Sequence, residues 1–126
     1  MVTVLIVDDS KWMRMQIKRA LEKLGCIVIG TAENGAEGVK KYKILNPTLV
    51  IMDITMPVMN GLVALKKIKE YDQKANVIIC SSLNQDPMLA ETQSLGAKVW
   101  LTKPFAEKEL HTIIKKNFKD QLIIPY

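Results

Sequence analysis

The sequence predicts an α/β protein in which one doubly wound parallel sheet has helices on both faces. Short runs rich in β-branched residues alternate five times with amphipathic helical patterns, which is typical of right-handed βαβ units. The runs 2–7, 49–52 and 77–80 are apolar throughout, as expected of parallel strands buried on both faces. The length of 126 residues suits five such units in a single domain spanning 1–126. A barrel of eight units needs about twice as many residues.

Each expected strand is followed by an expected helix. The strands are 2–8, 27–32, 48–53, 76–81 and 98–102. The helices are 10–24, 35–45, 61–71, 87–95 and 105–118. The first helix places Met13, Ile17 and Leu21 on one stripe. Ser10 at its start and Gly25 at its end are typical helix-capping residues.

Acidic residues follow two of the strands that the topology brings together. The commonest order for five such strands is 2-1-3-4-5, the flavodoxin-like arrangement. There the winding reverses between the first and third strands, and ligands bind in the crevice at their carboxyl ends. Asp8 and Asp9 end the first strand and Asp53 ends the third. We therefore expect three carboxylates to lie together at this edge.

Three neighbouring carboxylates need a group that offsets their repulsion. Each pair about 4 Å apart costs about 4 kcal/mol at an effective dielectric near 20, and raised pKa values, a cation, or both could offset it. Mg²⁺ suits such a set of oxygen ligands, whereas zinc does not, because no His or Cys is near. Ser81 ends the fourth strand and Lys103 follows the fifth. With a metal, this hydroxyl and ammonium could clamp a phosphoryl group transferred to an Asp nucleophile.

Each of these residues also has a purely structural interpretation when it is taken alone. Asp8 and Asp9 could begin the first helix, where Asp is favoured, and Asp53 could be a turn residue. Ser81 could be a packing residue, and Lys103 could be an ordinary loop lysine. The functional interpretation is favoured because all of them follow strands at the same edge of the sheet.

The residues at this edge make the whole chain resemble a response-regulator receiver domain of the two-component systems. Within that family it resembles the free-standing chemotaxis regulators of the CheY type. The motifs that carry the resemblance are Asp8-Asp9-Ser10 with Met13-Arg14, Met52-Asp53-Ile54-Thr55-Met56-Pro57 with Gly61, Ser81, and Lys103-Pro104-Phe105. Each motif alone is weakly to moderately specific, but their joint occurrence at the ends of the right strands is highly specific.

The resemblance implies a metal-assisted phosphorylation site. Asp53 would accept a phosphoryl group from a phosphohistidine on a sensor histidine kinase. Asp9 and Asp53 would bind Mg²⁺ directly, and the backbone carbonyl of Thr55 would complete the protein ligands. Asp8 would act largely through a metal-bound water.

The resemblance also implies a switch. Ser81 and Lys103 would bind phosphoryl oxygens, and the Lys103–Pro104 bond would be cis. Trp100 would move inward as Ser81 approaches the phosphate. The change would be read on the face formed by the fourth helix, fifth strand and fifth helix, and the expected target is the flagellar motor switch protein. The chain would catalyse at most its own phosphorylation and dephosphorylation.

Three positions depart from the family pattern. Asn60 stands where an Asp usually precedes the glycine of the acceptor loop, and we expect its turn role to survive because Asn also suits turns. Trp100 replaces a smaller aromatic residue, so its inward state should be harder to reach. Leu83, two residues beyond Ser81, cannot hold an attacking water, which predicts slow self-dephosphorylation.

Composition narrows the class and location of the protein. No apolar run approaches the ~20 residues of a membrane span, and the N-terminus lacks the pattern of a signal peptide. Cys26 and Cys80 match no metal motif, so we expect reduced core thiols in a cytoplasmic protein. The net charge is +5, but the lysines are scattered, which indicates solvated helix faces rather than nucleic-acid binding. A monomer is the default expectation.

Other functions remain open at this point. The chain could be the receiver half of a larger regulator, either a transcription factor or a methylesterase; Gly30-Thr31-Ala32 resembles the receivers of the latter, and the apolar tail 122–126 keeps this alternative open. A phosphohydrolase with an Asp nucleophile would need a second Asp at position 55, where Thr stands. An FMN carrier would need a Ser/Thr/Gly-rich phosphate loop in place of the acidic residues after the first strand.

Overall fold

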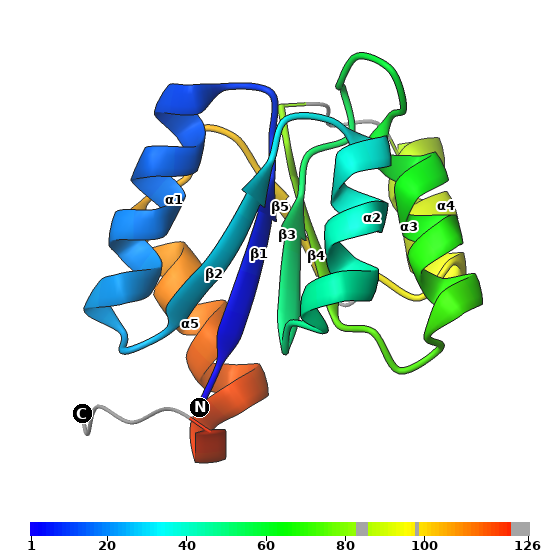
Figure 1. Cartoon of the computed structure of the whole chain (residues 1–126). Helices are drawn as coiled ribbons and strands as arrows, with labels where there is room; N and C mark the ends of the chain where they lie inside the picture. The colour runs from blue at the N-terminus through cyan, green and yellow to red at the C-terminus, as the bar shows by residue number, and fades with distance from the viewer. Residues whose placement is uncertain (83–85, 98, 122–126) are drawn as a thin grey trace.

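The computed structural model describes residues 1–82, 86–97 and 99–121 (Figure 1). Leu83 and the tail 122–126 lie outside the described residues, so the expectations that rest on them stay predictions. Lys98, at the start of the last expected strand, also lies outside them.

Strands and helices alternate along the described chain as predicted. The strands are β1 (Thr3–Val7), β2 (Ile27–Ala32), β3 (Leu49–Met52), β4 (Val77–Ser81) and β5 (Val99–Thr102). The helices are α1 (Lys11–Lys23), α2 (Gly35–Leu45), α3 (Gly61–Tyr71), α4 (Asp86–Ser94), α5 (Glu107–Phe118) and the 3₁₀ turn η1 (Lys119–Gln121). The bounds of β2, α2 and α3 are as expected, and those of the other expected elements differ by one or two residues. The helix expected from residue 105 begins later because Ala106 has an extended backbone, with φ −80° and ψ 146°.

The strands form one parallel sheet in the order β2-β1-β3-β4-β5, which confirms the predicted topology. Helices α1 and α5 cover one face, and α2, α3 and α4 cover the other (Figure 1). Val7 at the end of β1 pairs with Met52 at the end of β3, and Ser81 of β4 pairs with Thr102 of β5. The residue after each of these positions therefore emerges at the same edge of the sheet.

The apolar core is divided between the two faces of the sheet. In β1, Val4 and Ile6 pack with side chains of α1 and α5, whereas Leu5 and Val7 pack with those of α2 and α3. All four are fully buried. Burial on both sides explains why β1 is apolar throughout rather than alternating, because successive side chains of a strand point to opposite faces.

Polar side chains begin three of the helices near the carboxyl edge of the sheet. The side chain of Ser10 accepts the Met13 N–H at the start of α1, at 3.2 Å. Asn34 starts α2 in the same way. Asn60 Oδ1 accepts the Val63 N–H at 3.0 Å, which confirms that Asn keeps the expected turn role before α3. These caps satisfy N–H groups that would otherwise lack a partner.

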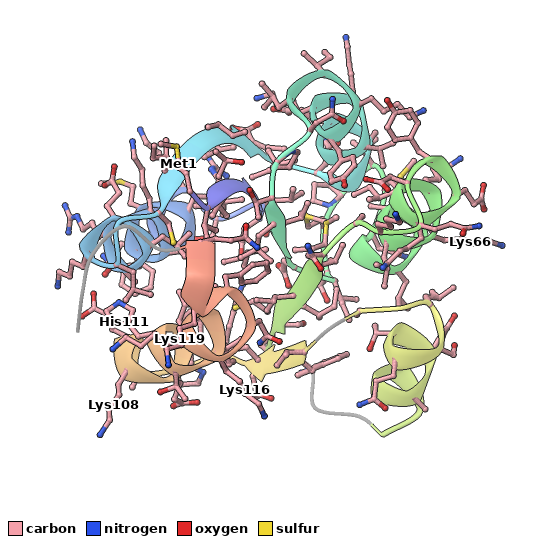
Figure 2. All side chains as sticks on the ribbon, turned by 90° about the horizontal axis from the view of Figure 1, so that it is seen from below. Met1, Lys66, Lys108, His111, Lys116 and Lys119 are labelled. Atoms are coloured by element: carbon pink, nitrogen blue, oxygen red, sulfur yellow. The ribbon has the colours of Figure 1, made fainter. Side chains whose placement is uncertain are left out.

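Most basic side chains of the helices are exposed. Lys66, Lys108 and Lys116 are exposed, and Lys66 and Lys108 point away from the molecule in Figure 2. This placement agrees with the expectation of solvated helix faces. Among the residues described, none of the helices has both the length and the apolar character that a membrane crossing requires.

The two cysteines are free thiols in the core, as expected. Burial raises the pKa of the Cys26 thiol to about 11. It raises the pKa of the Cys80 thiol to about 12. Both side chains therefore stay protonated at neutral pH and act as small apolar groups.

Candidate functional site

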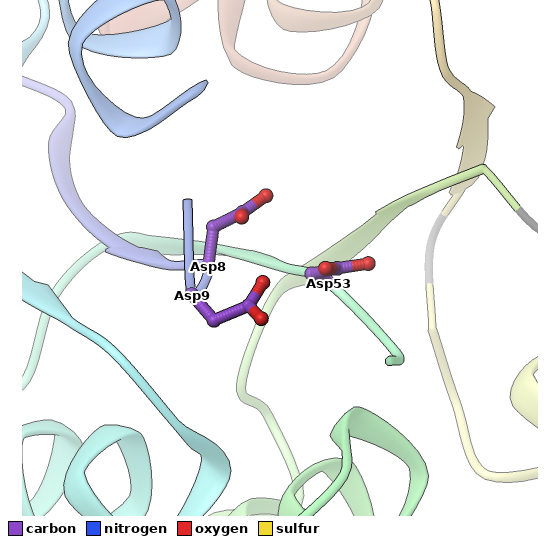
Figure 3. Close-up of side chains that lie close together, drawn as sticks. All are labelled: Asp8, Asp9 and Asp53. Carbon is purple, nitrogen blue, oxygen red and sulfur yellow. The ribbon is translucent and has the colours of Figure 1, made fainter. Parts of the chain in front are cut away.

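Three carboxylates meet at the carboxyl edge of the sheet, as the topology predicts (Figure 3). Asp8 and Asp9 follow β1 and Asp53 follows β3, and one carboxylate oxygen of each lies within 4.8 Å of the others. The Asp53 N–H donates to the Val7 carbonyl at 2.9 Å, which extends the ladder between β1 and β3 to the site itself. Asp8 and Asp53 are buried, and Asp9 is exposed.

Lys103 joins this cluster from the loop after β5. Its Nζ lies 2.6 Å from Asp8 Oδ2 and 3.6 Å from Asp53 Oδ2. Its backbone N–H donates to the Ser81 carbonyl at 2.9 Å, so the end of β4 fixes where the loop starts. The Lys103–Pro104 peptide bond is cis, as the family resemblance implies. The ammonium group of Lys103 therefore lies beside two of the carboxylates.

The electrostatics of the site favour the binding of a further cation. Burial raises the pKa of Asp53; the positive charge of Lys103 lowers it, and the charge of Asp8 raises it again, for a net increase. Burial lowers the pKa of Lys103, but the hydrogen bond to Asp8 and the charge of Asp53 outweigh this effect, for a net increase. One ammonium therefore neutralises three carboxylates only in part, and negative charge remains at the site.

The oxygens of Asp8 and Asp53 are held differently. Asp8 Oδ1 accepts the Ser10 N–H at 2.9 Å, and its Oδ2 holds Lys103. Asp53 Oδ1 accepts the Ile54 N–H at 2.8 Å. Among the described residues, the contact that its Oδ2 makes is the longer one of 3.6 Å with Lys103. Asp53 thus keeps one oxygen that is not closely hydrogen-bonded by the described residues.

The other predicted site residues lie around this edge at different depths. Ser81, the last residue of β4, is buried. Thr55, two residues after Asp53, is exposed. Trp100 in β5 is half-buried against the apolar cluster beneath α2 and α3. Its indole N–H is buried and has no hydrogen-bond partner among the described residues.

The loop between β3 and α3 closes tightly behind Asp53. A Cβ on Gly61 would lie 2.0 Å from the Asp53 carbonyl oxygen, so only glycine fits there. The Gly61 N–H donates to the Ile54 carbonyl at 2.8 Å. Val58, between these points, has a left-handed backbone with φ 66°, which is unusual for a β-branched residue. The sequence offers no signal for this strained turn, because Val ordinarily favours extended backbone.

Arg14 is a site residue for which the sequence predicts no role. It belongs to the motif that carries the resemblance, and its Nη1 donates to the backbone carbonyl of Asp8 at 2.6 Å. Arg14 is one of several basic residues in α1. Charge pattern alone does not separate it from the exposed ones.

The donor set fits a hard divalent cation. Among the described residues, the clustered candidate ligands are the carboxylate oxygens of Asp8, Asp9 and Asp53. Mg²⁺ prefers such ligands and keeps several waters. The exposed Asp9 leaves one side of the cluster open to solvent, where those waters and a phosphoryl oxygen could lie.

Comparisons with known proteins agree with this geometry. Residues 4–115 match the family model described as "Response regulator receiver domain". The chemotaxis protein CheY of Bacillus subtilis is 50% identical over 113 residues, which cover 89% of this chain and 94% of that protein. CheY of Thermotoga maritima is 46% identical over 116 residues, which cover 92% of this chain and 97% of that protein.

Solved structures give the same result. The crystal structure of a CheX–CheY–BeF3–Mg²⁺ complex from Borrelia burgdorferi superimposes with a TM-score of 0.89 at 35% identity, covering 93% of this chain and 89% of that one. The response regulator domain of Thermotoga maritima CheB superimposes with a TM-score of 0.85 at 33% identity, covering 98% of both chains.

The family match, the fold and the three carboxylates at the carboxyl edge of the sheet therefore all indicate a receiver domain. The chain belongs to the response regulator receiver domain family and is a phosphorylatable response regulator homologous to the CheY proteins of chemotaxis.

Proposed function

We propose that Asp53 is the phosphoacceptor of this regulator. The observation that carries the proposal is the placement of its carboxylate, which is buried between Asp8, Asp9 and Lys103 at the carboxyl edge of the sheet. Within the described part of the chain, Asp53 Oδ2 is the oxygen that lacks a close hydrogen bond, whereas both oxygens of Asp8 are occupied. A nucleophile needs such an available oxygen.

In the proposed reaction, Asp53 Oδ2 forms a bond to the phosphorus of a phosphohistidine. The P–N bond breaks, and its electron pair stays on the imidazole nitrogen. Lys103, now 3.6 Å from Asp53 Oδ2, would stabilise negative charge on the phosphoryl oxygens, and the Ser81 hydroxyl would bind another of them. Phosphoryl transfer depends mainly on such positioning and charge stabilisation.

Mg²⁺ is the proposed cofactor. Asp9 and Asp53 would bind it directly, together with the backbone carbonyl of Thr55. Asp8 would act through a metal-bound water, which agrees with the two hydrogen bonds that already hold its oxygens. When bound, the ion would supply the positive charge that three carboxylates and a phosphoryl group require.

Phosphorylation would act on the rest of the molecule through Ser81 and Trp100. Ser81 would move toward the phosphoryl group, and Trp100 would turn further inward. The indole is half-buried, and its N–H has no partner among the described residues. This supports the proposal that the Trp100 side chain can adopt a second orientation. The readout face would be α4, β5 and α5. The chain would have no enzymatic output beyond its own phosphorylation and dephosphorylation.

The proposed partners are those that the resemblance to the CheY proteins implies. A sensor histidine kinase would supply the phosphoryl group in the cytoplasm. The target would be a chemotaxis protein such as the flagellar motor switch protein. The regulator would bind it as a monomeric single domain, and nucleic acid would not be a partner. The complex from Borrelia burgdorferi, in which a CheY binds CheX, supports a protein target.

A second proposal is a receiver within a larger regulator. The methylesterase of Archaeoglobus fulgidus is 43% identical over 103 residues, which cover 80% of this chain but 29% of that protein. The reading frame around the coding sequence would separate the two proposals, since a methylesterase would require a long downstream catalytic region.

Intact-mass measurement tests the phosphoacceptor. Wild type and Asp53→Asn are incubated briefly with acetyl phosphate, with and without Mg²⁺. We expect one phosphoryl adduct on the wild type, dependent on the metal, and none on the variant. A folded wild type without an adduct, or an equal adduct on Asp53→Asn, would refute the assignment.

A further inference from the structure

We infer that Arg14 is a positioning residue for the metal site, because its guanidinium fixes the peptide group that joins Asp8 to Asp9. The inference rests on the proposed Mg²⁺ site. It assigns a role to a residue that contacts neither the acceptor nor the phosphoryl group.

Arg14 reaches back from the first turn of α1 to the end of β1. Its Nη1 donates to the Asp8 carbonyl oxygen at 2.6 Å, across six residues of sequence. Its Nη2 lies 3.6 Å from the carboxylate of Glu33, in the loop between β2 and α2. The Arg14 side chain is only 12% exposed. An arginine so little exposed is rare unless it is paired, and the contact with the Asp8 carbonyl is the shorter of these two contacts.

The Asp8 carbonyl belongs to the peptide bond between the two acidic residues. That peptide is planar, so its orientation determines the directions in which Asp8 and Asp9 project from the chain. On the other side of Asp8, its N–H donates to the Ala32 carbonyl at 3.0 Å. With Arg14 on the carbonyl, the backbone of Asp8 is held at both ends. Asp9 is exposed, and because the described residues provide no such anchor for its side chain, its position depends on this peptide.

A charge effect and a positioning effect predict opposite changes in Mg²⁺ affinity. If Arg14 acted only as a positive charge near the site, it would repel the metal, and its removal would tighten Mg²⁺ binding. If it positions the peptide, its removal lets Asp8 and Asp9 sample other orientations, and Mg²⁺ binding weakens. Outer residues that orient metal ligands typically contribute about 10–100-fold to metal affinity.

The experiment measures the Mg²⁺ dissociation constant by calorimetric titration of the full chain. The variants are Arg14→Met, which removes the charge and all the N–H donors, and Arg14→Lys, which keeps the charge and an ammonium that can still donate to the Asp8 carbonyl. Arg19→Met is the matched control, because Arg19 is exposed on the same helix. Glu33→Gln removes the outer ion pair and leaves the Asp8 contact in place. Circular dichroism and urea denaturation establish that each variant is folded.

We expect Arg14→Met to weaken Mg²⁺ binding by about tenfold or more and Arg14→Lys to recover part of the loss. Arg19→Met and Glu33→Gln should stay near wild type. With saturating Mg²⁺, phosphorylation of Arg14→Met by acetyl phosphate should approach the wild-type rate, since only the metal affinity is impaired. A purely structural role would lower stability without this dependence on the metal.

Unchanged or tighter Mg²⁺ binding by Arg14→Met would overturn the inference and leave the proposed metal site intact. If Arg14→Met does not fold, Arg14→Lys decides, because wild-type Mg²⁺ affinity in that variant would show that the guanidinium is not needed to hold the peptide and would overturn the inference. A wild type that binds no Mg²⁺ would overturn the metal site itself and this inference with it.

Discussion

Replacing Lys103 with methionine should destabilise the protein in the absence of Mg²⁺. Methionine keeps the length of the aliphatic stem but removes the ammonium group that lies 2.6 Å from Asp8 and 3.6 Å from Asp53. The Asp8 side chain is 2% exposed and the Lys103 side chain 14%. The substitution therefore leaves a buried carboxylate without its counter-ion and removes the cation that opposes the repulsion between Asp8, Asp9 and Asp53.

The size of this effect follows from the burial of the pair. Removing one partner of a buried ion pair costs about 3–5 kcal/mol. The lower end applies here because Asp9 opens the site to solvent. A loss of about 3 kcal/mol, with an m-value of about 1.5 kcal/mol per M, lowers the midpoint of urea unfolding by about 2 M. Total stabilities are about 5–15 kcal/mol, so the variant should still fold.

Urea denaturation with and without Mg²⁺ tests the reasoning. Mg²⁺ should reduce the difference in the free energy of unfolding between Lys103→Met and wild type. In the variant, the ion replaces the missing positive charge and no longer competes with the ammonium. Lys116→Met, at an exposed position of α5, is the control and should change stability by less than about 0.5 kcal/mol. Wild-type stability of Lys103→Met without Mg²⁺, or a gap that saturating Mg²⁺ leaves unchanged, would refute the assignment of Lys103 as the counter-ion.

Three further predictions concern the acceptor and its loop. Burial and then the charge of Asp8 raise the pKa of Asp53 in the folded state. Proton binding at Asp53 therefore stabilises the fold, and this stabilisation is complete below the usual aspartate pKa of about 3.9. It is lost as the pH rises through the folded-state pKa. Asp53→Asn should therefore be more stable than wild type at neutral pH without Mg²⁺, and urea denaturation should show the advantage shrinking toward about pH 4; a constant difference would count against a raised pKa. Gly61→Ala should cost about 3 kcal/mol and abolish the phosphoryl adduct, because its Cβ would lie 2.0 Å from the Asp53 carbonyl oxygen; wild-type stability and labelling would disprove this. Val58→Gly should raise stability by about 0.5–1 kcal/mol, since the left-handed backbone at φ 66° costs about 1–2 kcal/mol for a residue with a side chain; a lower melting temperature would contradict the strain.

The topology and the acidic cluster could be predicted because both follow from burial patterns. A strand that is apolar on both faces must lie inside a parallel sheet, and the order of such a sheet brings the ends of β1 and β3 together. The pairing of Val7 with Met52 places Asp8 beside Asp53. No detail of side-chain geometry is needed for that result.

The finer arrangement of the site could not be predicted from residue types. The sequence places Lys103 near all three carboxylates but does not show that its closer partner is Asp8. The closer partner depends on the path of the loop after β5, which starts where the Lys103 N–H donates to the Ser81 carbonyl. The contact between Arg14 and the Asp8 carbonyl could not be predicted either. Every residue has a backbone carbonyl, so the residue types in the sequence do not identify which one accepts the hydrogen bond.

The left-handed backbone at Val58 could not be predicted for a different reason. Local propensity favours extended backbone for Val, and the short loop between Asp53 and Gly61 overrides it. The Met59 N–H donates to the Pro57 carbonyl at 2.7 Å, which closes a tight turn around Val58. Tertiary closure, rather than the residue itself, therefore determines this conformation.

Locating the phosphoryl group tests the central claim most directly. Wild-type protein labelled with acetyl phosphate and Mg²⁺ is treated with borohydride, which reduces an aspartyl phosphate to homoserine, and peptide mass spectrometry then finds the reduced residue. We predict homoserine at position 53 alone, and only when both phosphodonor and metal were present. Homoserine at position 8 or 9, or at no position in a folded protein, would contradict the account.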